Sequence, residues 1–156
     1  MSRPLVLALL VCLLPQAEAN EDTALAAVET FFKAMAGNDW ELASSVMIDD
    51  AVLYGYRLDA GKVVLGRTTV AEYLQSMADR NDRLLERIWD VQVLEQGRLA
   101  TVWAPYDFFL NGEFHHCGTN SFSLIRDEGG WRIAGVVYSM LTDTCQASPL
   151  GPPEFD

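Results

Sequence analysis

The stretch EFHHCGTNSF, residues 113–122, places two histidines and a cysteine side by side. Imidazoles and thiolates are the ligand types that zinc and other borderline metals favour. If the stretch is a β-strand, successive side chains point to opposite faces, so His115 and Cys117 share one face and His116 takes the other. Three ligands from this stretch alone cannot then meet at one ion, and no spacing motif elsewhere announces further ligands. We therefore expect neither a metal site nor another cofactor.

His116 could take part in chemistry without a metal. The ordinary pKa of histidine lies near neutrality, so an imidazole in a cavity can act as a general acid or base. Equally, His116 can be a core side chain that hydrogen-bonds to Tyr106 or to the backbone. The chain shows no nucleophile motif and no Gly-rich phosphate loop. His116 is thus a candidate catalytic residue without an identified partner.

Helical patterns dominate the first half of the chain. Apolar residues recur at helical spacing over residues 23–36, and the Gly-Asn-Asp run that follows ends the pattern. Asp39 can cap a short second helix that runs to about residue 47. A capping-box pattern that begins at Thr69 predicts a third helix. Short strands are expected at residues 51–56 and 62–65.

After about residue 81 the chain changes to long runs rich in β-branched and aromatic residues. Turn-forming stretches at 95–97, 111–112 and 127–130 divide these runs, which predicts four long antiparallel strands joined by tight turns. Helices gathered on one face of such a sheet indicate an α+β fold.

A family resemblance rests on this order of elements. The front segment VETFFKAMAGNDWELASSVMIDDAVLY and the hairpin GGWRIAGVVYS resemble the NTF2-like superfamily of cone-shaped, cystatin-like α+β domains. The segment YDFFLNGEFHHCGTNSFSLIRDEGGWRI is similar to its exported lumazine-binding-like and SnoaL-like branch. The resemblance covers residues 22–142 and implies three N-terminal helices packed on a curved antiparallel sheet. It implies little about function, because the superfamily includes enzymes, binding modules and dimerising subunits.

The ketosteroid isomerases of this superfamily are similar enough for their positions to be compared. Their chemistry needs a carboxylate base and two acidic hydrogen-bond donors. The comparison places Gly55 at the position of the base, Phe31 at the donor tyrosine and Asn120 at the protonated aspartate. All three groups differ here, so the resemblance disfavours that isomerase activity.

The register of the hairpin around Asn111-Gly112 decides which side chains face the helices. A two-residue turn would pair Phe108 with His115, whereas a turn with a bulge at Gly112 would pair Phe108 with Phe114 and Tyr106 with His116. We prefer the second register because it gathers apolar residues on one face. That concave face would then hold Ala104, Tyr106, Phe108, Phe114, His116, Asn120, Phe122 and Leu124.

This register predicts a small-molecule cavity on the concave face. A few polar groups, Tyr106, His116 and Asn120, would lie among apolar side chains, as is typical of such sites. The expected ligand-binding residues are Tyr106, His116, Asn120, Phe108, Phe122 and Tyr54. The opposite face would hold Thr101, Trp103, Asp107, His115 and Cys117, with His115 and Asp107 forming a surface cross-strand pair.

The N-terminus is typical of an exported protein. Arg3 precedes a run of ten apolar residues, too short to span a bilayer, and Ala-Glu-Ala at 17–19 offers a cleavage point. We therefore expect a signal peptide at residues 1–19, a single domain at 20–147, and a flexible or surface-bound tail at 148–156. The mature protein would be secreted or periplasmic, with no membrane segment left after cleavage.

Two cysteines, Cys117 and Cys145, remain after this cleavage. In an oxidising compartment they are expected to form a disulfide, and the alternative is a pair of buried thiols. The formal net charge of −11 makes nucleic acid and anionic membranes poor partners.

Three classes of function fit these observations. The leading hypothesis is a domain that binds a small, largely apolar or aromatic ligand in its cone. An enzyme of dehydratase, isomerase or hydrolase type would use His116 as general acid or base. A dimerising interaction module would bury the convex sheet face around Trp103, and we expect a homodimer. In the alternative monomer, the C-terminal segment would cover Trp103.

Overall fold

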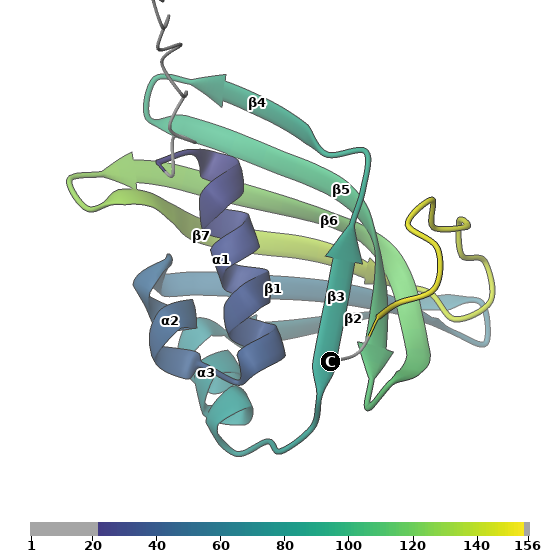
Figure 1. Ribbon diagram of the computed structural model, residues 1–156. Helices are drawn as coiled ribbons and strands as arrows, with labels where there is room; N and C mark the ends of the chain where they lie inside the picture. The colour runs from purple at the N-terminus through teal and green to yellow at the C-terminus, as the bar shows by residue number, and fades with distance from the viewer. Residues whose placement is uncertain (1–21, 155–156) are drawn as a thin grey trace, which may run out of the picture.

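The computed structural model describes residues 22–154, which form three helices on one side of a curved sheet (Figure 1). The expected signal peptide, residues 1–19, lies outside the described residues. The helices are α1 (Ala24–Gly37), α2 (Trp40–Ser45) and α3 (Val70–Ala78). No helix in the described part of the chain is both long and apolar enough to cross a membrane.

The helix ends follow the capping signals in the sequence. The Thr23 side chain accepts a hydrogen bond from the Ala26 amide at 3.0 Å, and Asp39 Oδ1 accepts one from Leu42 at 2.9 Å. Thr69 and Glu72 form a complete capping box at the start of α3. Each bond satisfies an amide that a helix leaves without an internal partner, so all three predicted helices are confirmed near their predicted starts.

The sheet is mixed, and not wholly antiparallel as expected. Its order is β2-β1-β7-β6-β5-β3, with β4 also paired to β5. β1 and β7 run parallel while the other neighbours run antiparallel, because β7 returns to the centre of the sheet beside a strand from the front of the chain. The strands are β1 (Met47–Asp59), β2 (Lys62–Thr69), β3 (Leu84–Ile88), β4 (Gln92–Gln96), β5 (Leu99–Leu110), β6 (Glu113–Asp127) and β7 (Gly130–Met140).

The first long strand expected after residue 81 is divided into β3 and β4. Asp90 between them has a φ of 46°, in the left-handed region, so the chain cannot continue as one extended strand. β3 pairs with the end of β5 and β4 with its beginning. β3 lies at the edge of the sheet, next to α1 (Figure 1).

The β5–β6 hairpin has neither of the two registers considered above. Asn111 and Gly112 form a two-residue turn with φ of 53° and 89°, and Phe109 pairs with Phe114. A bulge at the next residue, His115, then pairs Phe108 with His116. His116 therefore faces inwards as expected, but Phe114 does not: its side chain is 49% exposed on the other face.

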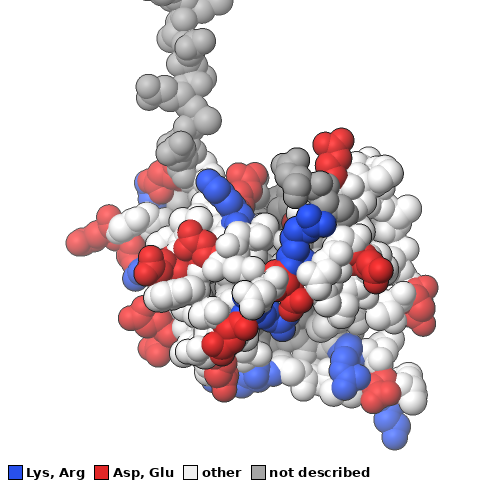
Figure 2. Space-filling model, turned by 60° about the horizontal axis from the view of Figure 1, so that its bottom comes forward, with Lys and Arg blue, Asp and Glu red and all other residues white. Residues whose placement is uncertain are grey.

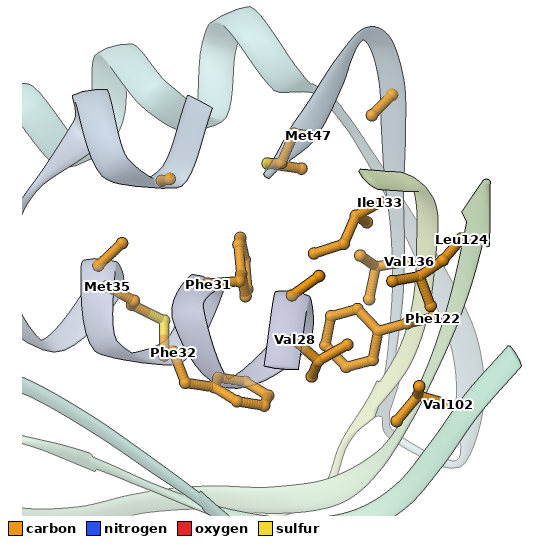
Figure 3. Close-up of a cluster of buried hydrophobic side chains, with 14 of the residues drawn as sticks. Val28, Phe31, Phe32, Met35, Met47, Val102, Phe122, Leu124, Ile133 and Val136 are labelled. Atoms are coloured by element: carbon orange, nitrogen blue, oxygen red, sulfur yellow. The ribbon is translucent and has the colours of Figure 1, made fainter. Parts of the chain in front are cut away.

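The core lies between α1 and the sheet. Val28, Phe31, Phe32 and Met35 on α1 point towards inward-facing residues of β5, β6 and β7 (Figure 3). The rings of Phe31 and Phe32 both meet Phe122 edge-on, with centroids 6.0 and 5.6 Å apart. This packing fixes the position of α1 over one end of the concave face and leaves the other end for a cavity.

The C-terminal segment is fastened to the outer face of the sheet. Cys117 and Cys145 form the expected disulfide, with their Cα atoms 5.7 Å apart. Arg87 on β3 donates to the Gly151 carbonyl at 3.0 Å, and its guanidinium also pairs with Asp107 at 2.6 Å. The predicted surface pair of His115 and Asp107 is wrong, because Asp107 is buried against Arg87.

Candidate functional site

A cavity of about 380 Å³ occupies the wide end of the cone, between α1, α3 and the concave face of the sheet. Most of its wall is aromatic or aliphatic. His115, Ser76 and Arg80 are exposed as well as lining it, so they stand at its mouth. The remaining lining residues are Phe31, Phe32, Met35, Leu53, Thr68, Tyr73, Met77, Leu84, Glu86, Tyr106, Phe108, Leu110, His116, Asn120, Phe122, Val136, Tyr138 and Met140.

Five of the six expected ligand-binding residues line this cavity: Tyr106, Phe108, His116, Asn120 and Phe122. Tyr54 does not, and its side chain is 46% exposed. Its neighbour Leu53 is buried and lines the cavity instead. Successive residues of a strand face opposite sides, so the placement of Tyr54 was wrong by one residue.

Glu86 on β3 is a polar residue of the cavity wall that the sequence reasoning missed. Its carboxylate Oε1 accepts a hydrogen bond from Asn120 Nδ2 at 2.6 Å. Glu86 is paired with Phe108, and Phe108 is paired with His116, so the three lie in one row across three strands. The available signal was the alternation in LLERI, which puts Glu86 on the same face as the buried Leu84.

The surroundings of Glu86 favour its neutral form. Burial raises its pKa to about 8, because the ionised carboxylate loses hydration, and the negative charge of Asp107 acts in the same direction. The hydrogen bond from Asn120 opposes the rise. At pH 7 the carboxyl group is therefore mostly protonated and can donate as well as accept a hydrogen bond.

His116 is held in its neutral form. Burial lowers its pKa to about 4, and the neighbouring His115 adds to the effect. The bulge brings the Nδ1 atoms of His115 and His116 to 2.8 Å, so one ring donates and the other accepts. His116 is thus hydrogen-bonded to His115, whereas the hydroxyl of Tyr106 has another partner.

That partner of Tyr106 is the backbone of β7. The Tyr106 hydroxyl donates to the Ser139 carbonyl at 2.7 Å. The carbonyl reaches inwards over Gly118, where a Cβ atom would lie only 1.9 Å from the Ser139 oxygen. A side chain at Gly118 would force this part of β7 away. Glycine at this position therefore lets the Ser139 carbonyl come close enough to accept the hydrogen bond from Tyr106.

Tyr138 and Tyr73 complete the polar surroundings of Glu86. Burial raises the pKa of both phenols, and the nearby Glu86 raises them further. The ring of Tyr138 lies over Gly55, where an added Cβ would come within 2.6 Å of it. The position that aligns with the base of the isomerases therefore has no side chain here, and a tyrosine takes the space.

The family follows from a comparison with known proteins. The model of the SnoaL-like domain matches residues 24–143, which is most of the chain. The chain belongs to the SnoaL-like domain family. A comparison with curated proteins gave no match.

Solved structures similar to this SnoaL-like domain have the same fold. An NTF2-like protein of unknown function from Shewanella baltica has a TM-score of 0.56 at 14% identity, over 77% of this chain and 92% of its own. A candidate dehydratase of the NTF2-like family from Streptomyces avermitilis has a TM-score of 0.58 at 20% identity, over 78% and 95%. The β subunit of a candidate aromatic-ring-hydroxylating dioxygenase from Novosphingobium aromaticivorans has 0.60 at 16% identity, over 84% and 97%. Such distant likeness shows the fold alone.

The SnoaL-like cavity has the groups for hydrogen bonding and proton transfer. A neutral imidazole can accept a proton and a protonated carboxyl group can give one. Within residues 22–154, no three His, Cys, Asp or Glu side chains are arranged to hold a metal ion.

Proposed function

We propose that residues 20–147 form an exported SnoaL-like domain that binds a small, largely apolar or aromatic ligand in the cavity. The observation behind the proposal is the cavity itself: about 380 Å³, walled by aromatic and aliphatic side chains, with few polar groups. This volume is within the roughly 300–1,000 Å³ of small-molecule sites. The apolar wall supplies affinity, and Glu86, Asn120 and His116 fix the orientation of the polar part of the ligand.

A pair of phenylalanine variants tests this proposal. Phe108 lines the cavity, whereas Phe114 is exposed on the opposite face of the same hairpin. Purified wild type, Phe108→Ala and Phe114→Ala are incubated with a metabolite extract of the host, and retained compounds are identified by mass spectrometry. We expect wild type and Phe114→Ala to retain the same compound and Phe108→Ala to lose it. Equal retention by both variants, or none by wild type, would contradict the proposal.

Export of the protein is the second part of the proposal. The N-terminal pattern at residues 1–19 supports it, and the Cys117–Cys145 disulfide fits an oxidising compartment such as the periplasm or the exterior. Cell fractionation followed by N-terminal sequencing tests it. We expect a mature chain that starts at Asn20, and an uncleaved cytoplasmic chain would refute export.

Acid–base catalysis is a second candidate function, favoured by the opposite pKa shifts of two groups in one cavity. The pKa of Glu86 is raised to about 8 and that of His116 lowered to about 4. A dehydratase could use neutral His116 to remove a proton from carbon, while protonated Glu86 gives a proton to the departing hydroxyl, which leaves as water. A compound of the extract that wild type converts and folded His116→Asn does not would establish this activity. Conversion by neither protein would argue against it.

A homodimer through the convex sheet face is the third part of the proposal. Trp103 on this face is 38% exposed, so the C-terminal segment does not cover it fully, and Leu94 and Ile125 on the same face are exposed too. Exposed apolar groups on a broad sheet mark association sites. We expect a two-chain mass in sedimentation that Trp103→Glu halves. A one-chain mass that the substitution leaves unchanged would rule the dimer out.

A further inference from the structure

Glu86 is the one acidic side chain that lines the cavity in the described part of the chain. Its row across the sheet places its side chain on the concave face with Phe108 and His116, and Asn120 binds only one of its two carboxyl oxygens in the hydrogen bonds of the described residues. The salt bridges of residues 22–154 include none to Glu86. Within the described residues, this carboxyl group therefore has no positively charged partner.

Aromatic rings surround this carboxyl group. Tyr73 on α3, Tyr106 on β5 and Tyr138 on β7 are each close enough for the charge of Glu86 to shift their pKa values. Phe108 is its cross-strand neighbour, and the ring of Phe31 stacks on Tyr73 at 5.5 Å. Aromatic faces attract cations through their quadrupoles, most strongly where water is excluded.

The net negative charge of the whole molecule also favours a cationic ligand. The chain has 22 acidic and 11 basic residues, and acidic side chains are spread over the face shown in Figure 2. Such a surface raises the local concentration of small cations and lowers that of anions.

We infer that the cavity binds an organic cation, an ammonium group on a small apolar or aromatic body, with the positive charge seated against Glu86 and the surrounding tyrosines. The inference rests on the proposed function and names the chemical class of the ligand. The ammonium group supplies the counter-charge that the described residues do not give Glu86, and the aromatic wall takes the apolar body.

Arg80 at the mouth is the feature that favours the opposite charge. It lines the cavity, so an anionic ligand could contact it there. However, its guanidinium lies 3.9 Å from the Asp82 carboxylate, and its side chain is about half exposed to water, which screens its charge. Glu86 is deeper and less hydrated, so its charge acts more strongly on a bound ligand.

Cation binding is coupled to the release of the proton of Glu86. The titratable and charged groups that line the cavity with Glu86 are Tyr73 and Arg80 from the α3 region, Tyr106 from β5, His115 and His116 from β6, and Tyr138 from β7. Asp107, paired with Arg87 on the other face of the sheet, acts on Glu86 through its charge. With the pKa of Glu86 raised to about 8, a bound cation expels its proton. Affinity for a permanent cation therefore increases as the pH rises, by about 50-fold between pH 6 and pH 8.

Three probes of similar shape test the inference. Benzyltrimethylammonium is a permanent cation, neopentylbenzene is its neutral isostere, and phenylacetate is an anion. Calorimetry measures the soluble probes, and ligand-observed NMR measures neopentylbenzene, all with the full mature chain at pH 6 and pH 8. We expect benzyltrimethylammonium to bind tightest, with release of a proton and with the pH dependence given above.

Glu86→Gln is compared with Glu113→Gln, which removes the same charge from the exposed start of β6. At pH 8, Glu86→Gln should weaken benzyltrimethylammonium binding at least tenfold and change neopentylbenzene binding less than threefold, whereas Glu113→Gln should change neither. If Glu86→Gln fails to fold, the pH dependence and proton release of wild type decide.

The possible results distinguish the charge of the ligand from the existence of a ligand site. Binding of neopentylbenzene or phenylacetate in preference to the cation would overturn the inference and leave the proposed ligand site standing. Cation binding without pH dependence would also overturn it. Failure of all three probes to bind would contradict the inference and count against the ligand site as well.

Discussion

Replacing Glu86 by glutamine should make the protein more stable at high pH. The folded state keeps the Glu86 proton up to a pKa of about 8, whereas the unfolded chain releases it near 4.5. Wild-type stability is therefore fully present below pH 4.5, falls between 4.5 and 8, and is constant above. The shift corresponds to about 4 kcal/mol between pH 5 and pH 9. Water in the open cavity reduces this figure, so we expect about 2–4 kcal/mol.

Urea unfolding under non-reducing conditions at several pH values between 5 and 9 measures this effect. The free energy of unfolding of Glu86→Gln minus that of wild type should be near zero at pH 5 and increase towards pH 9. His116 titrates in both proteins, so its contribution cancels in the difference. Glu113→Gln serves as the control and should show no such increase. A difference that stays constant across this pH range would refute the burial and the raised pKa of Glu86.

Other predictions concern the stability of the scaffold. Cys145→Ser should lower the free energy of unfolding by about 2–4 kcal/mol in urea titrations, and an unchanged value would mean that the disulfide of residues 117 and 145 adds no stability. Gly118→Ala should destabilise the fold more than Gly37→Ala, since Gly37 has open space around it and no left-handed backbone conformation; equal losses would contradict the close approach of Ser139. Tyr106→Phe should cost about 1–3 kcal/mol, because it leaves the buried Ser139 carbonyl without its donor. An unchanged free energy of unfolding would mean that water replaces the Tyr106 hydroxyl as the donor to the Ser139 carbonyl.

The sequence predicted most of the local structure because its signals are local. Thr69 and Glu72 satisfy each other's backbone groups within one turn, so α3 can be recognised without knowing what it packs against. The inward position of His116 was predicted from the clustering of apolar residues. The parallel pairing of β1 with β7 joins segments about eighty residues apart and has no local signature.

The site was harder to predict, because it depends on single-residue shifts and distant contacts. The bulge at His115 lies inside a strand and not at the turn, so no turn-forming residue marks it. Tyr54 was placed on the wrong face because the apolar and aromatic residues on both sides of it do not show which alternate residues of the strand point inwards. Glu86 was overlooked because its strand was expected to be part of one long strand, whereas β3 ends at Ile88 and the positive φ of Asp90 separates it from β4. Only the assembled sheet brings Glu86 within reach of Asn120.

The central claim is that the cavity holds a small organic molecule. Native mass spectrometry of the protein purified from its own host tests this claim most directly. We predict a complex in which each mature chain, alone or in a dimer, carries one small molecule, which denaturation releases and which Phe108→Ala fails to retain. A mass accounted for by the protein chains alone, together with a crystal structure in which side chains fill the cavity, would contradict the claim.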